Sequence, residues 1–180
     1  MKYHELIKDF LKESDRNSIL DWIANNPFLD DDENQKKGFA STYKKDELPD
    51  WLNSFKDEKY NIYNFIGFFT FVGGFIEPHT DHDLFSYVKR KIDPSFIIGF
   101  PETIVYYADV CENMVGGNLI VDDKEITPVT NSAVYLEKNK VHSVTEVKSF
   151  DRERIVLVCE KYFLIESYYN KLVTPIHRYG

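Results

Sequence analysis

Cysteine is scarce in this chain. Among 180 residues there are only two, Cys111 and Cys159, and their separation matches neither CxxC nor CxxxC. A disulfide framework needs several cysteines, and a structural zinc site needs closely spaced ligands. The sequence therefore predicts neither of these, and it favours a reducing environment, for which we expect a cytoplasmic location.

Long runs of basic residues and long runs of apolar residues are also missing. The chain has 22 Lys and Arg against 30 Asp and Glu, a formal net charge of -8, so a polyanion would be repelled overall. No stretch reaches the ~18 apolar residues that span a bilayer. The N-terminus alternates charged with apolar residues, unlike a targeting segment. We therefore expect neither a nucleic-acid partner nor a membrane segment.

Aromatic and β-branched residues are plentiful, and they gather in short runs bounded by Gly, Pro, Asn and Asp. The chain has 14 Phe and 12 Tyr. After residue 60 the runs are IYNFIGFFTFVGGFIEPH, TIVYYADV, GGNLIV, EITPV, SAVYLE, VHSVTEV and RIVLVCEKYF. Few helix-length patterns separate them, so they predict a mainly β fold of the sandwich or barrel type.

The length suits a single domain over residues 1–180. Within it we expect residues 1–58 to form helical N-terminal support and a loop, residues 59–163 to form the β core, and residues 164–180 to form a C-terminal tail.

Helical spacing of apolar residues is confined to the first part of the chain. Over residues 3–26 it predicts two short helices broken near residues 14–17, and residues 49–55 suit a further turn or two. The polar segment 26–46 is predicted to be a long surface connection or a mobile flap. Residues 83–101 break the strand rhythm and predict a loop or short helix at the rim.

An HxD pair, His79 and Asp81, ends the most apolar of the strand-like runs. Side chains two residues apart in a strand point to the same side, so both could point into a barrel, whereas His82 is expected to face outward. His142 would reach them from a later strand. Two neutral imidazoles and one carboxylate leave three positions free on an iron ion that must bind a bidentate co-substrate and O2.

A candidate anion-binding residue heads the run RIVLVCE. There Arg154 begins an alternating apolar face, and its guanidinium could receive the distal carboxylate of 2-oxoglutarate. A strand-end arginine can also simply reach water. Arg152 has the same parity and stays an alternative. In TIVYYADV one of two adjacent tyrosines must face inward, and its hydroxyl could bind the same carboxylate; we choose Tyr107, with Tyr106 in reserve.

Together these residues resemble the 2-oxoglutarate and Fe(II)-dependent dioxygenases, particularly the prolyl-hydroxylase-like branch, over residues 61–163. In chain order, PHTD supplies the HxD, IVYYADV the tyrosine strand, MVGGNLIV a GG-x-L-type turn and strand, VHSVTEV the distal histidine, and RIVLV the arginine. The family often has a tyrosine about ten residues before the first metal histidine. This chain has Phe69 and Thr70 there, and Thr70 could supply a hydroxyl instead.

The resemblance implies a double-stranded β-helix, or jelly roll, with N-terminal supporting helices and iron near one open end. It implies a hydroxylase that holds Fe(II) with His79, Asp81 and His142. Arg154 and Tyr107 would bind 2-oxoglutarate, and O2 would be consumed as succinate and CO2 are released. The prime substrate is left open between a prolyl or other peptidyl residue and a small molecule.

Two other classes of protein share such residues. One is a cupin-like metal-binding protein or isomerase without oxygenase activity, and the other is a non-catalytic jelly-roll interaction domain. Neither needs 2-oxoglutarate, so dependence on this co-substrate separates them from a dioxygenase.

Overall fold

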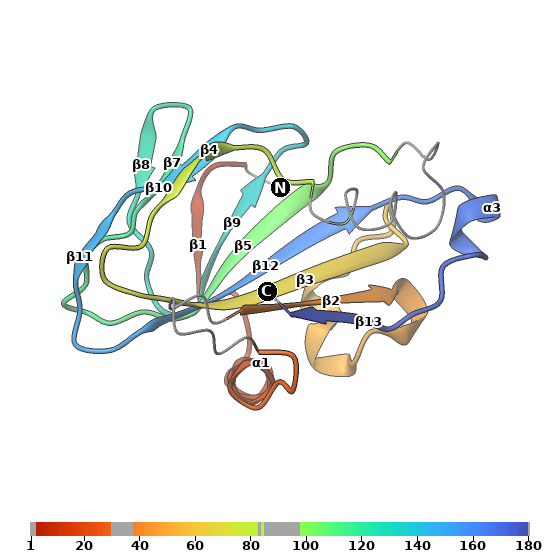
Figure 1. Cartoon of the computed structure of the whole chain (residues 1–180), viewed down its shortest axis with the longest axis horizontal. Coiled ribbons are helices and arrows are strands. Elements are labelled where there is room, and N and C mark those ends of the chain that lie inside the picture. The colour runs from red at the N-terminus through yellow and green to blue at the C-terminus, as the bar shows by residue number, and fades with distance from the viewer. Residues whose placement is uncertain (1–2, 30–37, 83, 85–97, 180) are drawn as a thin grey trace.

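Two antiparallel sheets pack face to face and form the body of the molecule (Figure 1). The structure is a computed structural model and describes residues 3–29, 38–82, 84 and 98–179. In this part of the chain the larger sheet has the order β1 (Leu6–Lys8), β9 (Ser132–Leu136), β5 (Glu102–Asp109), β12 (Arg154–Tyr162), β3 (Ile62–Thr70), β2 (Gly38–Lys44) and β13 (Ile176–Tyr179). The smaller sheet has the order β4 (Ile76–His79), β10 (His142–Val144), β7 (Leu119–Val121) and β8 (Lys124–Ile126), and β6 (Val115–Gly116) pairs with β11 (Val147–Ser149). This is a jelly roll, and the predicted mainly β fold class is confirmed.

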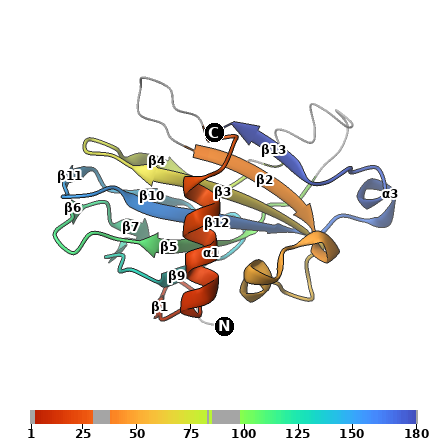
Figure 2. The same ribbon diagram turned by 90° about the horizontal axis from the view of Figure 1, so that it is seen from below.

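Helices cover the outer face of the larger sheet, as Figure 2 shows for α1 (Glu13–Ala24). The 3-10 helix η1 (Lys45–Glu47) precedes η2 (Asp50–Phe55), which is the turn predicted over residues 49–55. A short helix, α3 (Glu166–Tyr169), follows β12. Because α1 and η2 bury their apolar residues against this face, the predicted supporting helices are present.

The N-terminal segment differs from its prediction. Residues 3–26 do not form two helices, because the first apolar group forms β1 and pairs with β9. Positive φ angles at His4 and Asp9, 56° and 52°, interrupt the backbone on either side of this strand. The helix α1 then runs unbroken through residues 14–17. Its first turn carries Glu13 and Asp15, and acidic residues there favour a helix N-terminus instead of a break.

The prediction of an irregular connection over residues 26–46 is wrong for its second half. Residues 38–44 form β2, which is almost entirely buried and lies between β3 and β13. Residues 30–37 lie outside the described part. The tail predicted over residues 164–180 also contributes to the sheet, since its strand β13 pairs with β2.

The predicted rim insertion at residues 83–101 falls mostly outside the described residues. Of those that are described, Leu84 and Ile98 are buried in an apolar cluster with Ile62 and Tyr162.

Alternation along β12 separates the two faces of the larger sheet. Leu157 and Cys159 join the core under α1. The neighbouring residues, Val156 and Val158, face the smaller sheet and share that side with Arg154. The space between the sheets is therefore where the predicted site residues can meet. No helix in the described ranges is long and apolar enough to cross a membrane.

Candidate metal centre and co-substrate pocket

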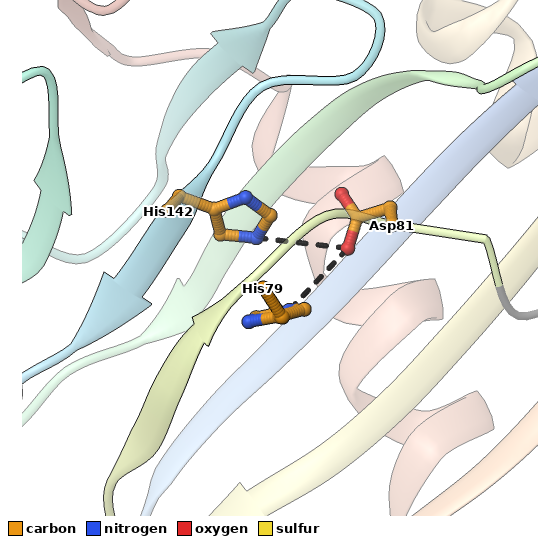
Figure 3. Close-up of side chains that lie close together, drawn as sticks. All are labelled: His79, Asp81 and His142. Carbon is orange, nitrogen blue, oxygen red and sulfur yellow. Dashed lines mark ion pairs between the residues drawn. The ribbon is translucent and has the colours of Figure 1, made fainter.

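Strand register brings the two candidate histidine ligands together. β4 ends at His79 and β10 begins at His142, and these two residues are direct partners in the antiparallel pair. Asp81 follows β4 by two residues, and its Oδ1 lies 3.6 Å from the Nε2 atom of each histidine. Figure 3 shows both rings beside this carboxylate. All three candidate ligand atoms lie within 4.8 Å of one another.

Backbone carbonyls fix the tautomer of both rings. The Nδ1 atom of His79 lies 2.8 Å from the carbonyl oxygen of Glu77, and Nδ1 of His142 lies 3.1 Å from that of Lys140. A carbonyl oxygen can only accept, so each Nδ1 carries the proton and donates it. In the neutral ring the lone pair is then on Nε2, the atom that faces Asp81. This is the usual way in which a protein orients histidines toward a metal ion.

The charge states at the cluster suit a cation. Burial lowers the pKa of His142, which is 6% exposed and therefore favours its neutral form. Burial alone would raise the pKa of Asp81, but hydrogen bonding from His79 and the nearby His142 outweigh it and lower that pKa. In its protonated form His79 carries a hydrogen on both ring nitrogens and can hydrogen-bond Asp81 through Nε2, and this raises the pKa of His79. The cluster thus presents an ionised carboxylate and basic nitrogens to one point.

The sequence reasoning missed Thr103, whose side chain hydrogen-bonds Asp81 and helps to lower the pKa of that carboxyl. Thr103 is buried on β5 and has the same strand parity as Tyr107. Parity was the available signal, because alternation puts both side chains on the inner face. Parity does not predict the contact with Asp81, because Asp81 follows β4 and is not part of β5.

A buried arginine lies in the same space. Arg154 is 2% exposed and stands over the ring of Tyr107, 5.5 Å from its centroid. Among the described residues no acidic side chain forms an ion pair with it, and burial lowers its pKa. A buried guanidinium without an anion is poorly solvated, so a carboxylate ligand would be stabilised there.

Two protein groups hold this guanidinium in place. Its Nε donates to the hydroxyl of Thr70 at 3.1 Å, and its Nη1 donates to the carbonyl of Gly117 at 2.5 Å. Thr70 lies directly opposite Arg154 in the pairing of β3 with β12. The dioxygenases that the sequence resembles often have a tyrosine about ten residues before the first metal histidine, and Thr70 was predicted to supply a hydroxyl in its place. In the structure this hydroxyl accepts the hydrogen bond from Arg154. Gly117 belongs to the GG turn, and its carbonyl contact was not foreseen.

The alternative residues lie elsewhere. Arg152 is 57% exposed and forms an ion pair with Asp109. Tyr106 belongs to the core under α1 and donates its hydroxyl to Asn131 at 3.0 Å. His82 is exposed, as its parity predicted.

One cavity of about 150 Å³ joins the two halves of the site. The candidate metal ligands line it together with Arg154 and Tyr107, and apolar side chains such as Val156 complete the wall. Burial raises the pKa of Tyr107 to about 12, so its phenol stays protonated and can donate a hydrogen bond at neutral pH. The arrangement can therefore accommodate a metal ion and, beside it, a small dicarboxylate.

Several solved structures share this fold. A viral collagen prolyl hydroxylase from Paramecium Bursaria Chlorella virus-1, in its 2OG complex, has a TM-score of 0.60 at 17% identity, covering 91% of this chain and 97% of that chain. A Pseudomonas putida prolyl-4-hydroxylase has a TM-score of 0.59 at 14% identity, with coverages of 89% and 92%. IDO from Bacillus thuringiensis has a TM-score of 0.51 at 11% identity, with 89% of each chain covered.

No protein-family model and no curated protein sequence matches the chain. The structural likeness confirms the jelly-roll prediction, and the resemblance to the prolyl-hydroxylase-like branch holds at the level of the fold.

Proposed function

We propose that this protein is an Fe(II)- and 2-oxoglutarate-dependent dioxygenase that hydroxylates a C–H bond of its prime substrate. One observation carries the proposal. A set of two histidines and one carboxylate shares a small cavity with a buried arginine that has no anionic partner among the described residues. A metal site alone would suit many proteins. The arginine adds, in the lining of the same cavity, a binding place for a ligand carboxylate.

The residues present fit Fe(II). His79 and His142 would bind it through Nε2, and Asp81 would bind it through a carboxylate oxygen, a donor set that non-haem iron oxygenases use. The carbonyls of Glu77 and Lys140 hold the two rings in the ligating tautomer. When bound, iron would supply the redox chemistry that couples oxidative decarboxylation of 2-oxoglutarate to hydroxylation: one atom of O2 enters succinate as CO2 is released, and the other enters the hydroxylated product.

Arg154 and Tyr107 would anchor the 5-carboxylate of 2-oxoglutarate. The guanidinium supplies charge-assisted hydrogen bonds, and the protonated phenol supplies a further donor. The apolar wall formed by Val156, Leu119 and their neighbours would exclude water from the reacting end. We infer that the whole chain, residues 1–180, works as one such domain.

The prime substrate that we propose is a prolyl or other peptidyl residue. Two structural neighbours are prolyl hydroxylases, and this suggestion rests on that likeness alone. The competing class is a cupin-like metal protein or isomerase, which would bind a metal without needing Arg154 as an anion site.

The proposal can be tested without knowing the prime substrate. Fe(II) and 2-oxoglutarate are added to the metal-free protein under anaerobic conditions, and the visible iron-to-oxoglutarate charge-transfer band is recorded. We expect the band in the parent protein and its loss in His142→Ala, because one imidazole ligand is removed. His82→Ala is the matched control, since this neighbouring histidine is exposed and lies outside the cluster.

Circular dichroism of each variant shows whether it is folded. A folded parent protein that gives no band would refute the dioxygenase proposal and favour the cupin-like class. A band that survives in His142→Ala, or that is lost equally in His82→Ala, would refute the ligand assignment.

A further inference from the structure

A second, larger hollow adjoins the site cavity and has no role in the chemistry proposed so far. It has a volume of about 310 Å³ and lies between the end of β3, the turn that follows it, and β4. We call it the apolar groove. Its inner wall is shared with the site cavity, through the residues Ile66, Phe68, Ile76, Val144 and Arg154. A molecule in the groove would therefore lie next to the proposed metal and co-substrate positions.

The lining of the apolar groove is almost entirely hydrocarbon. Phe71 and Phe75 belong to this lining, and among the described residues no acidic or lysine side chain does. Among the described residues of the lining Arg154 is the one that is charged, and two of its nitrogens already donate to Thr70 and Gly117. Once the carboxylate of 2-oxoglutarate is bound to Arg154, a charged or strongly polar occupant of the groove would lose its hydration and gain no partner, whereas an apolar group would be stabilised.

Apolar side chains are also exposed at and next to the hollow. Phe75 is 61% exposed and Val72 is 51% exposed, both in the turn between β3 and β4. The groove and these exposed side chains together offer more apolar surface than a single substrate side chain would cover. It suits an occupant that continues outside the groove, as a polypeptide does.

The backbone beside the groove gives a second reason to expect a peptide. Ile76 begins β4, and β4 is an edge strand of the smaller sheet in the described part of the chain. Edge strands readily pair with an extended peptide. Pro78 has no N–H to offer, so pairing would be limited to the Ile76 end of the strand, beside the groove.

We propose that the apolar groove binds the prime substrate, and that this substrate is a peptide segment which inserts an uncharged aliphatic or aromatic side chain. The inference rests on the proposed dioxygenase function and adds to it the place where the peptide binds and a preference for an uncharged side chain. The net charge of the chain, -8, would by itself favour a basic peptide. The lining of the groove instead favours an uncharged side chain.

The test measures peptide binding directly. The probes are blocked pentapeptides, acetyl-Gly-Gly-X-Gly-Gly-amide, with Leu, Phe, Lys or Glu at X, together with N-acetyl-leucinamide. Affinities are measured by NMR titration, with and without Fe(II) and 2-oxoglutarate under anaerobic conditions. The variant is Phe75→Ser. Its matched control is Phe163→Ser, because Phe163 is also 61% exposed but does not line the groove.

With Fe(II) and 2-oxoglutarate bound, we expect the Leu or Phe peptide to bind at least about tenfold more tightly than the Lys and Glu peptides. Phe75→Ser should remove this preference, and Phe163→Ser should keep it. Equal binding of all peptides, no binding of any, or an unchanged preference in Phe75→Ser would overturn the proposal. So would N-acetyl-leucinamide binding as tightly as the Leu peptide, because the occupant would then be a small molecule.

The two proposals can fail separately. If the charge-transfer band forms and the apolar preference is absent, the groove assignment is wrong and the dioxygenase proposal stands. If the preference is present and no band forms, the dioxygenase proposal is wrong and the groove is a peptide-binding site without that chemistry.

Discussion

Arg154 is the residue whose surroundings are hardest to explain by folding alone. Burying a guanidinium is costly unless an anion accompanies it, and no described acidic residue does so. Thr70 and the Gly117 carbonyl satisfy part of its hydrogen-bonding capacity but none of its charge. A ligand carboxylate would supply the missing charge. This is why we treat Arg154 as a binding residue, whereas Arg152 already has Asp109 as its partner.

Replacing this arginine should weaken 2-oxoglutarate binding selectively. Arg154→Ala removes the charge-assisted hydrogen bonds, so we expect the Kd for 2-oxoglutarate to rise by about tenfold to a hundredfold. Titration of the charge-transfer band measures it. Arg152→Ala is the control and should leave the Kd unchanged, because that side chain is exposed and bound to Asp109. A raised Kd in Arg152→Ala and an unchanged Kd in Arg154→Ala would mean that Arg152 binds the 2-oxoglutarate carboxylate.

The turn between β6 and β7 acts as an element that supports Arg154. Gly117 has a φ of +69°, and a Cβ atom there would lie 3.0 Å from both Arg154 Nη1 and Val147 Cγ2. Its carbonyl accepts the Nη1 hydrogen bond. Both the backbone conformation and the close approach therefore require glycine, and the GG turn links the smaller sheet to the candidate co-substrate pocket.

Gly117→Ala should thus affect both stability and co-substrate binding. The positive φ should cost about 1 kcal/mol of stability. The crowded guanidinium should raise the 2-oxoglutarate Kd severalfold. Gly73→Ala is the control: its φ is +84°, but nothing lies within 4 Å of an added Cβ. It should lose similar stability in urea unfolding with no change in Kd; equal changes in Kd for both variants would argue against a local effect at Arg154.

Strands with strong period-two patterns could be predicted from the sequence, and weaker ones could not. The runs that became β3, β5, β9 and β12 are rich in aromatic and β-branched residues, and their own composition indicates strands. β1 has three residues and exists because it completes the edge beside β9. β2, with the sequence GFASTYK, is buried by its neighbours β3 and β13. Such tertiary pairing leaves little trace in local sequence.

In the candidate site, too, residues with a local sequence signal could be predicted, and contacts between distant residues could not. His79, Asp81, His142, Arg154 and Tyr107 were found because each belongs to a short motif with a fixed strand parity, and the structure brings all five to one cavity. The supporting contacts made by Thr103, Thr70 and Gly117 join residues that are far apart in the sequence. They depend on register between strands, which a single sequence does not specify. The cytoplasmic location also stays a prediction.

At the scale of the whole molecule, one face of the larger sheet contributes to the candidate site and the other contributes to stability. The inner face carries the candidate site, and the outer face carries the main core and a buried ion pair between Glu102 and Lys161. Lys161 is 1% exposed and also lies 3.8 Å from Asp57. Tyr3 donates its hydroxyl to Glu102 at 2.6 Å, which ties the N-terminal segment to the sheet. This network should therefore support global stability.

Glu102→Gln should destabilise the protein by about 3–5 kcal/mol at pH 7, because it leaves Lys161 buried without its main anionic partner. Burial alone would raise the pKa of Glu102, but the hydrogen bonds from Lys161 and Tyr3 outweigh it, so the pKa lies below its ordinary value of 4.5. A carboxyl with a lowered folded-state pKa stabilises the protein above the unfolded-state pKa, and this contribution is lost as the pH falls through the folded-state pKa.

The stability difference between the parent and Glu102→Gln should therefore be largest at neutral pH and shrink progressively below pH 4.5. Urea unfolding of both proteins over a series of pH values measures it. Glu58→Gln is the matched control: Glu58 pairs with Lys45 at 2.6 Å but is 94% exposed, so its loss should cost about 0–1 kcal/mol. A difference for Glu102→Gln that stays constant with pH would mean that the lost stability comes from packing, and that the charge of the pair contributes nothing.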